Sequence, residues 1–455
     1  MNTANPETEG KLARSLGLWA VVLFGLAYMT PMIVYGTFGI LAEASQGMVP
    51  MTYILALCAV LLTAVSYGKM AYIFPVAGSA YTYARNSIGS GVGFVVGWAV
   101  LLDYFFLPMV IWLIGAAYLN EAFPGIPTQV WLLAFIAITT AINIIGIAFA
   151  SKVNFVLMIM QSLMVAVFIA LCIHYIVGAQ GAGGLLSVEP FFNSEVPFSF
   201  AFAGAAIAAY SFLGFDAVTT LTEETINPKK NMPRAIMLIA LIGGFVFVVA
   251  AYFAQLVHPG GEFDNVDAAA FTIAAKIGGD LFSGIFLIGL VIAQFASGLA
   301  AQTSVGRLLF AMGRDRVLPK AVFGYIHPHF NTPVYNLVLA GLVGLVALYL
   351  DVVTSASFIN FGAFLAFTFV NLSMVSLFLK KHEALAESSF LTTLVIPLAG
   401  AAFNLYLLFS LDLKAILLGC VWLGIGIAYL AFMTKGFSVP PPEVSYVEPD
   451  LDEAK

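Results

Sequence analysis

The strongest constraint on this chain is a series of apolar stretches, most of them long enough to cross a lipid bilayer. A membrane helix needs about 20 apolar residues. Unpaired backbone groups are costly in lipid, and these stretches lack the alternation of a β-barrel, so each is expected to be a helix. The twelve candidate spans lie near 16–41, 49–73, 91–119, 129–148, 153–177, 198–221, 235–257, 281–312, 334–350, 355–379, 389–410 and 413–433.

Composition supports an all-α integral membrane protein. Of its 455 residues, 61% are hydrophobic and only 9% are charged, whereas soluble proteins keep roughly a quarter of their residues charged. The net charge of -6 gives no sign of nucleic-acid binding. Cys58, Cys172 and Cys420 lie inside apolar stretches, which indicates packing rather than disulfides or a metal site. Neither a metal nor a cofactor is expected.

The basic residues predict the orientation. If the N-terminus is cytoplasmic, all Lys and Arg residues except Lys276 and Lys414 fall on cytoplasmic segments, as the positive-inside rule requires. We therefore expect a multi-pass protein of the bacterial inner membrane, with cytoplasmic tails at 1–15 and 434–455 and a transmembrane domain at 16–433. The C-terminal tail is rich in proline and acid and is expected to be disordered.

Two expected spans carry interruptions at matching places. The first contains the run 25–31, which ends in Thr30 and Pro31, and the sixth contains the run 210–216, with Gly214 inside it. Proline removes a backbone hydrogen bond, and glycine weakens a helix. Matching interruptions are typical of a transporter's binding site, although simple packing kinks are the alternative. The candidate substrate-binding residues in these runs are Tyr28, Met29, Thr30, Ser211, Phe212, Gly214, Phe215 and Asp216.

Two acids lie deep within expected spans, Asp103 and Asp216. A charged side chain at the bilayer centre costs at least ~2.5–3.5 kcal/mol on insertion scales, so such residues are functional candidates. Asp216, beside the second interruption, could bind a cationic amine or take up a coupling proton, or it could cap the following helix. Asp103 and its neighbour Tyr104 could line the same cavity, or Asp103 could bond to a neighbouring helix.

The aromatic residues near these acids allow two interpretations. They could form a wall around a cation, or they could be plain packing in a chain that is 14% aromatic. The five residues concerned are Tyr28, Tyr104, Tyr210, Phe212 and Phe215.

Several motifs resemble those of the amino acid–polyamine–organocation (APC) superfamily. They occur in the expected order over nearly the whole chain. The matching stretches are 67–69, 74–83, 93–98, 212–216 followed by 223–228, and 313–319 followed by 327–333.

Within that superfamily the chain looks most like the bacterial putrescine importers. The resemblance implies a LeuT-like five-plus-five inverted repeat, with repeats at about 16–177 and 198–379, two extra helices at about 389–433, and helices 1 and 6 broken. It also implies proton-driven uptake by alternating access. By the same resemblance, the acid at position 216 is linked to amine recognition, and Tyr104 matches a tyrosine tied to uptake.

The chain departs from that pattern at two positions. Gly36 stands where the putrescine importers are expected to carry an aspartate, so a monoamine is also a possible substrate. Gln161 stands where some proton-coupled members carry a lysine, which leaves the proton site unassigned.

A small amine such as putrescine is the favoured substrate, with an amino acid as the alternative. Backbone N–H groups at helix breaks bind carboxylates, but the break at Thr30 and Pro31 has no glycine cluster, and proline has no N–H. A channel or receptor is the other class of function, although no charged ring, carbonyl filter or output domain is apparent. The five scattered histidines make an enzyme the weakest interpretation.

Overall fold

The computed structural model describes Arg14 and residues 16–76, 78–145, 150–314, 318–330, 332–386 and 388–441. Residues 1–13, 15 and 442–455 of the predicted tails, and residues 77, 315–317 and 331 of the motifs, lie outside the described residues. The first half of the chain forms α1 (Leu18–Met29), α2 (Ile33–Gly36), α3 (Phe38–Ser45), α4 (Val49–Ile73), α5 (Ser79–Ser87), α6 (Ser90–Ala122), α7 (Thr128–Ile145), α8 (Ala150–Gln180), η2 (Ala182–Leu185), α9 (Ser199–Ala208), η3 (Ala209–Phe212) and η4 (Ala217–Glu224).

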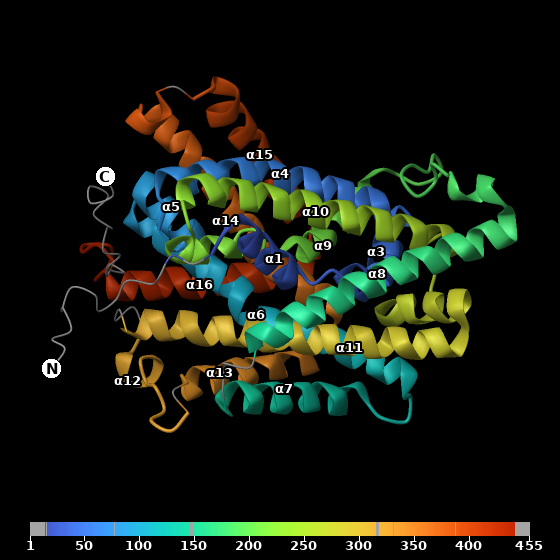
Figure 1. Cartoon of the computed structure of the whole chain (residues 1–455). Coiled ribbons are helices and arrows are strands. Elements are labelled where there is room, and N and C mark those ends of the chain that lie inside the picture. The colour runs from blue at the N-terminus through green and yellow to red at the C-terminus, as the bar shows by residue number, and fades with distance from the viewer. Residues whose placement is uncertain are drawn as a thin grey trace.

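The second half is helical as well, and the long helices of both halves run side by side along one direction (Figure 1). Its elements are α10 (Pro228–Val257), η5 (Val266–Ala268), α11 (Ala269–Arg314), α12 (Lys320–Phe323), α13 (Val334–Gly344), η6 (Leu345–Leu348), α14 (Val352–Leu379), η7 (Glu383–Leu385), η8 (Leu391–Val395), α15 (Ile396–Phe409) and α16 (Leu413–Met433).

Eleven segments of the described chain are long and apolar enough to span a membrane, against twelve expected. The segment that falls short is the one expected at 334–350. It forms a shorter apolar helix over Val334–Leu348, made of α13 and η6. At about 1.5 Å per residue, so short a helix covers less than the ~30 Å hydrocarbon thickness.

Other differences lie at helix ends. The expected span 235–257 begins earlier, at Pro228, where proline suits the first helical turn. The expected span 281–312 begins at Ala269 and contains a non-helical residue, Gly279, with φ 67°. Helix α5 follows Gly78, whose φ is 133°, and its polar sequence had given no sign of a helix.

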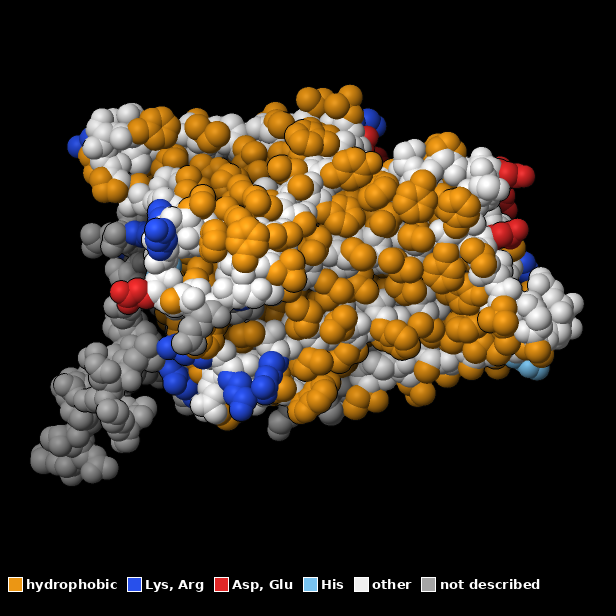
Figure 2. All heavy atoms as spheres, turned by 90° about the horizontal axis from the view of Figure 1, so that it is seen from above, with side chains coloured by type: hydrophobic (Ala, Val, Ile, Leu, Met, Phe, Trp, Pro, Cys, Tyr) orange, Lys and Arg blue, Asp and Glu red, His pale blue; other side chains and the backbone are white. Residues whose placement is uncertain are grey.

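The core lies where α4, α6, α10, α11 and α14 pack together. Helix α6 contacts both α11 and α14, and α4 packs along α10. Close approach in the α4–α10 pair depends on glycine: a Cβ on Gly68 would lie 3.3 Å from Pro233. Figure 2 shows a broad hydrophobic surface over the middle of the molecule. Most Lys and Arg side chains visible in that view gather at the end where the termini lie in Figure 1.

Candidate functional site

The first interruption separates α1 from α2. Helix α1 ends at Met29, and Thr30 adopts φ 56° and ψ 94°. The Thr30 hydroxyl donates to the carbonyls of Ala27 and Tyr28, each at 3.4 Å, and the Ile33 N–H donates to the Thr30 carbonyl at 2.9 Å. A positive φ at a non-glycine residue is strained, and these local bonds hold the chain in that conformation.

The second interruption follows α9. The helix gives way to η3, then to Gly214 with φ 115°, and then to η4. Asn360 of α14 donates its side-chain N–H to the carbonyls of Ala206, at 2.8 Å, and Ile207, at 3.2 Å. The carbonyl groups at the end of a helix lack partners within it, so Asn360 satisfies two of them from a neighbouring helix.

The two interruptions face each other. A Cβ on Gly214 would overlap the ring of Tyr28, so the backbone there can approach the first interruption only because residue 214 is glycine. This contact places Tyr28 beside the segment that carries Asp216.

Asp216 is buried, with 4% of its surface exposed. Its carboxylate accepts a hydrogen bond from the hydroxyl of Tyr67 on α4 at 3.4 Å, and the backbone N–H groups of Gly214 and Ala217 face it. The residue directly precedes η4 but makes no side-chain capping bond to it, which weighs against the capping alternative.

Asp103 on α6 belongs to the same buried group. Its side chain is 7% exposed, and it interacts electrostatically with Asp216. Tyr28 is within electrostatic reach of both carboxyl groups, and Tyr210 within that of Asp103. Among the side chains that the structure describes, no Lys or Arg pairs with either acid. Within the described residues, the site therefore holds two acids with no resident counter-charge.

Tyr104, the residue after Asp103, also faces this group. It lies within electrostatic reach of Asp103, Asp216, Tyr28 and Tyr67. Its hydroxyl is buried and has no hydrogen-bond partner in the described part of the chain. Buried polar groups are normally paired, so this hydroxyl is available to a bound molecule.

The two phenylalanines of the sixth span are packed among other rings. Phe215 lies 5.7 Å from the ring centre of Tyr67 and 5.1 Å from that of Phe367. Phe212 lies 5.3 Å from the ring centre of Phe247. The tyrosines are thus the aromatic groups beside the acids, and the two phenylalanines contribute mainly to packing.

Ser211 belongs to a chain of hydroxyl groups that the sequence did not reveal. Its hydroxyl lies 3.2 Å from that of Tyr53 on α4, which lies 3.3 Å from the hydroxyl of Thr37, between α2 and α3. Neither Tyr53 nor Tyr67 had been predicted as a site residue. Tyr67 stood in the recognised motif 67–69, but nothing in that motif indicated the direction of its hydroxyl.

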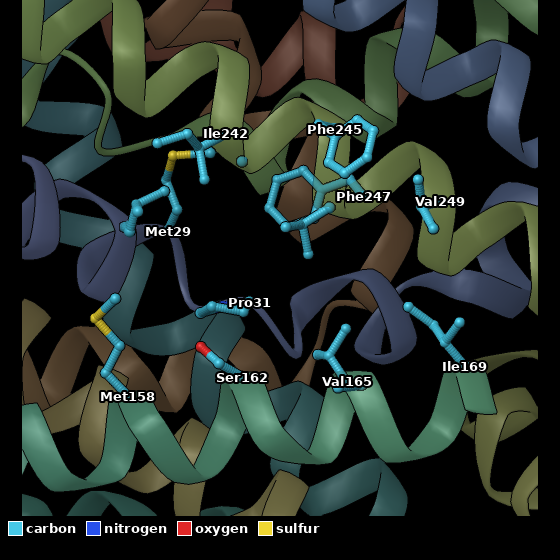
Figure 3. Close-up of a pocket in the computed structure, with 14 residues that line it drawn as sticks. Met29, Pro31, Met158, Ser162, Val165, Ile169, Ile242, Phe245, Phe247 and Val249 are labelled. Atoms are coloured by element: carbon cyan, nitrogen blue, oxygen red, sulfur yellow. The ribbon is translucent and has the colours of Figure 1, made fainter. Parts of the chain in front are cut away.

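Met29 points elsewhere, into an apolar cavity of about 250 Å³ beside the first interruption. Figure 3 shows Met29 beside Ile242 of α10 on one side of this space, and Pro31 with Ser162 and Val165 of α8 on the other. Ser162 is the one polar side chain in its lining, and neither Asp103 nor Asp216 lines it. This cavity does not have the charge that an amine would require.

Gly36 and Gln161, the two positions that depart from the family pattern, are both buried. A Cβ on Gly36 would lie 3.3 Å from the side-chain amide nitrogen of Gln294, and that amide has no partner within the described ranges. The Oε1 atom of Gln161 is likewise without a partner there.

Comparison with known proteins gives one family. The model of the amino acid permease family matches residues 16–443. The chain is 41% identical to the low-affinity putrescine importer PlaP of Escherichia coli (strain K12), over 95% of this chain and 96% of that one. It is 26% identical to the branched-chain amino acid permease BcaP of Bacillus subtilis, over 94% of each chain.

One solved structure shows the same fold at low sequence similarity. The inward-facing conformation of Mhp1 superposes with a TM-score of 0.55 and 15% identity, covering 95% of each chain. Mhp1 has a LeuT-like fold, and the chain shares that all-helical architecture.

Proposed function

Because the chain belongs to the amino acid permease family, whose members are transporters rather than enzymes, we propose that it imports a small organic amine such as putrescine by alternating access. The observation that carries this proposal is the pair Asp216, at the second interruption, and Asp103, on α6, both buried without a basic partner in the described chain. A cationic amine supplies the missing positive charge.

The surroundings of the two acids suit an ammonium group. Cations are attracted to the faces of aromatic rings, and Tyr28 and Tyr104 lie beside the carboxyl groups. The free hydroxyl of Tyr104 can accept a hydrogen bond from the amine. We assign substrate contacts to Tyr28, Asp103, Tyr104 and Asp216, with Gly214 allowing the close approach.

Proton coupling is part of the proposal and is assigned to Asp216. A carboxylate in a membrane interior can be neutralised by a substrate cation or by a proton. Because Tyr67 already donates to this carboxylate, a proton or an amine that arrives there changes a bond between α4 and the interrupted sixth span. That change is a physical basis for linking occupancy to the opening of the site.

The architecture that goes with this function is a five-plus-five inverted repeat. We assign the repeats to about 16–177 and 198–379, the extra helices to about 389–433, and the ninth of the twelve spans to Val334–Leu348. Helices 1 and 6 of this scheme are the broken ones. The gathering of Lys and Arg at one end (Figure 2) supports cytoplasmic tails at 1–15 and 434–455 in a bacterial inner membrane.

An amino acid is the second candidate substrate. The similarity to the branched-chain amino acid permease BcaP favours it. Against it stands the first interruption, where Thr30 bonds to its own helix and Pro31 has no N–H with which to hold a carboxylate.

The test is uptake of radiolabelled putrescine into proteoliposomes under an imposed proton gradient. Asp216→Asn should abolish most uptake, whereas Asp264→Asn, at an exposed position, should not change it. Uptake should collapse when the gradient is dissipated. If alanine, arginine or glutamate enters and putrescine does not, the amine proposal is wrong. If putrescine enters equally without a gradient, proton coupling is wrong.

A further inference from the structure

A second pocket, of about 600 Å³, opens between α4, α10 and the segment that follows α14. Its lining holds four basic residues. Lys69 comes from the last turns of α4, and Lys229, Lys230 and Arg234 come from the first turns of α10. Lys69 is half-buried and the other three are exposed. Two helices thus direct four positive charges to one open hollow.

These charges have no counter-charge in the protein as described. None of the four basic residues forms an ion pair with another described side chain. The first turn of α10 contains no acid, although a helix N-terminus carries a partial positive charge that favours anions. Lys229 and Lys230 add to that charge instead of balancing it. The repulsion among these groups would be relieved by a bound anion.

The rest of the pocket is apolar. Val65 of α4, Met237 of α10 and Leu385 of η7 line it beside the basic residues. Tyr72, with its amphipathic ring, is 52% exposed at the same place, and such rings are common at the membrane–water boundary. A free anion would use only the basic side of this pocket, whereas a molecule with a phosphate and a hydrocarbon chain uses both.

We propose that this pocket binds the anionic head group of a membrane phospholipid. The phosphate lies among Lys69, Lys229, Lys230 and Arg234, and an acyl chain passes along Val65 and Met237. Basic hollows between membrane helices recognise lipid head groups in this way. The proposal relies on the membrane orientation given above only to name the leaflet, which is the cytoplasmic one.

Such a lipid would act on the pair of helices that frames the transport site. Gly68 packs against Pro233 between the basic residues of the two helices. Tyr67, the partner of Asp216, lies two residues before Lys69. Further along α10, Gly243 contacts the side chain of Met29 at the first interruption. The bound lipid therefore holds α4 and α10 together where the basic residues of the two helices meet.

The experiment is native mass spectrometry of the delipidated full-length protein, titrated with dioleoyl phosphatidylglycerol. The test variant is Lys229→Gln/Lys230→Gln/Arg234→Gln, and the matched control is Lys320→Gln/Lys381→Gln/Lys435→Gln. The control changes three basic residues outside the pocket lining. A Lys or Arg near an anionic surface contributes about fivefold in affinity, so the test variant should bind roughly a hundredfold more weakly. The control should retain lipid.

Two further arms identify the ligand. Dioleoyl phosphatidylethanolamine, which has no net charge, should bind much more weakly than phosphatidylglycerol. Soluble glycerol 3-phosphate should not displace phosphatidylglycerol. Equal displacement by glycerol 3-phosphate would show a free-anion site, and equal lipid binding by test and control variants would show no specific site. Either result overturns the proposal.

This measurement contains no transport substrate, so its outcome is independent of the proposed amine uptake. Thermal stability in detergent without added lipid should be the same or slightly higher in the test variant than in the wild type, because the three substituted side chains are exposed and their mutual repulsion is removed. The addition of phosphatidylglycerol should then raise the melting temperature of the wild type and of the control, but not that of the test variant.

Discussion

The ring of Tyr28 lies directly against the backbone of Gly214, so the interruption in the first span touches the interruption in the sixth. The contact exists because Gly214 has no Cβ and adopts φ 115°. It sets the distance between the first interruption and the segment that carries Asp216. A change in the relative position of the two interrupted spans would alter this contact.

Gly214→Ala should therefore impair both stability and uptake. The added methyl group overlaps Tyr28, and alanine is strained at this φ, which together should cost about 1–3 kcal/mol. The melting temperature in detergent and uptake in proteoliposomes measure the two effects. Gly284→Ala is the control, because a Cβ there meets nothing within 4 Å and the residue is helical. Equal behaviour of the two variants would contradict the role of the Tyr28 contact.

Tyr67→Phe should weaken substrate handling while leaving the fold intact. It removes the hydroxyl that donates to Asp216 at 3.4 Å but keeps the ring that packs on Phe215 and Phe367. A hydrogen bond to a charged group contributes about 1.5–3 kcal/mol, so KM or maximal uptake should change by roughly tenfold or more. Tyr349→Phe, at an exposed position outside both pockets, should behave as wild type. An unchanged uptake profile in Tyr67→Phe would remove Tyr67 from the mechanism.

Asp103→Asn should lower uptake without lowering the stability of the protein. Asp103 and Asp216 are two neighbouring buried carboxyl groups, with no basic partner in the described chain. Neutralising one of them removes an electrostatic penalty, so the melting temperature should stay the same or rise. Uptake of a cationic amine should fall, because one of its counter-charges is lost. A large fall in melting temperature would show instead that Asp103 has a structural role.

Asn360→Ala should destabilise the end of α9. It removes the donor shared by the carbonyls of Ala206 and Ile207, and a buried acceptor left without its partner should cost about 1–3 kcal/mol. Ser357→Ala, on the same helix, is the matched control, because the buried hydroxyl of Ser357 has no partner in the described chain. In detergent, the melting temperature of Asn360→Ala should be lower than that of the wild type. The melting temperature of Ser357→Ala should stay the same or rise.

The membrane class and the family followed from local features of the chain. Apolar stretches must become helices in lipid, since each backbone group has to find a partner within its own segment, and eleven such segments are present among the described residues. The resemblance to the APC superfamily is confirmed by the match over residues 16–443. The segment at 334–350 is the exception: hydropathy marked it as a span, but it is shorter than the other candidate spans.

The candidate site was predictable only in part. Asp103 and Asp216 were recognisable because an ionisable side chain has a high free-energy cost in lipid, and the structure brings the two residues together. The aromatic prediction was less specific, because Phe212 and Phe215 pack among other rings. Met29 faces an apolar cavity instead of the acids. Hydropathy and motif patterns do not say which side of a buried helix a residue occupies when apolar residues surround the helix.

The sequence by itself determined that this protein lies in a lipid bilayer, that its secondary structure is helical, and to which family it belongs. Each of these depends on the chemistry of short segments. Only the tertiary structure decided which polar groups meet. The hydroxyl of Tyr67 reaches Asp216 across 149 residues of chain, and four basic residues of α4 and α10 converge on one pocket. Such contacts depend on how long helices pack and rotate against one another, and that packing is the sum of many small interactions spread over the whole chain.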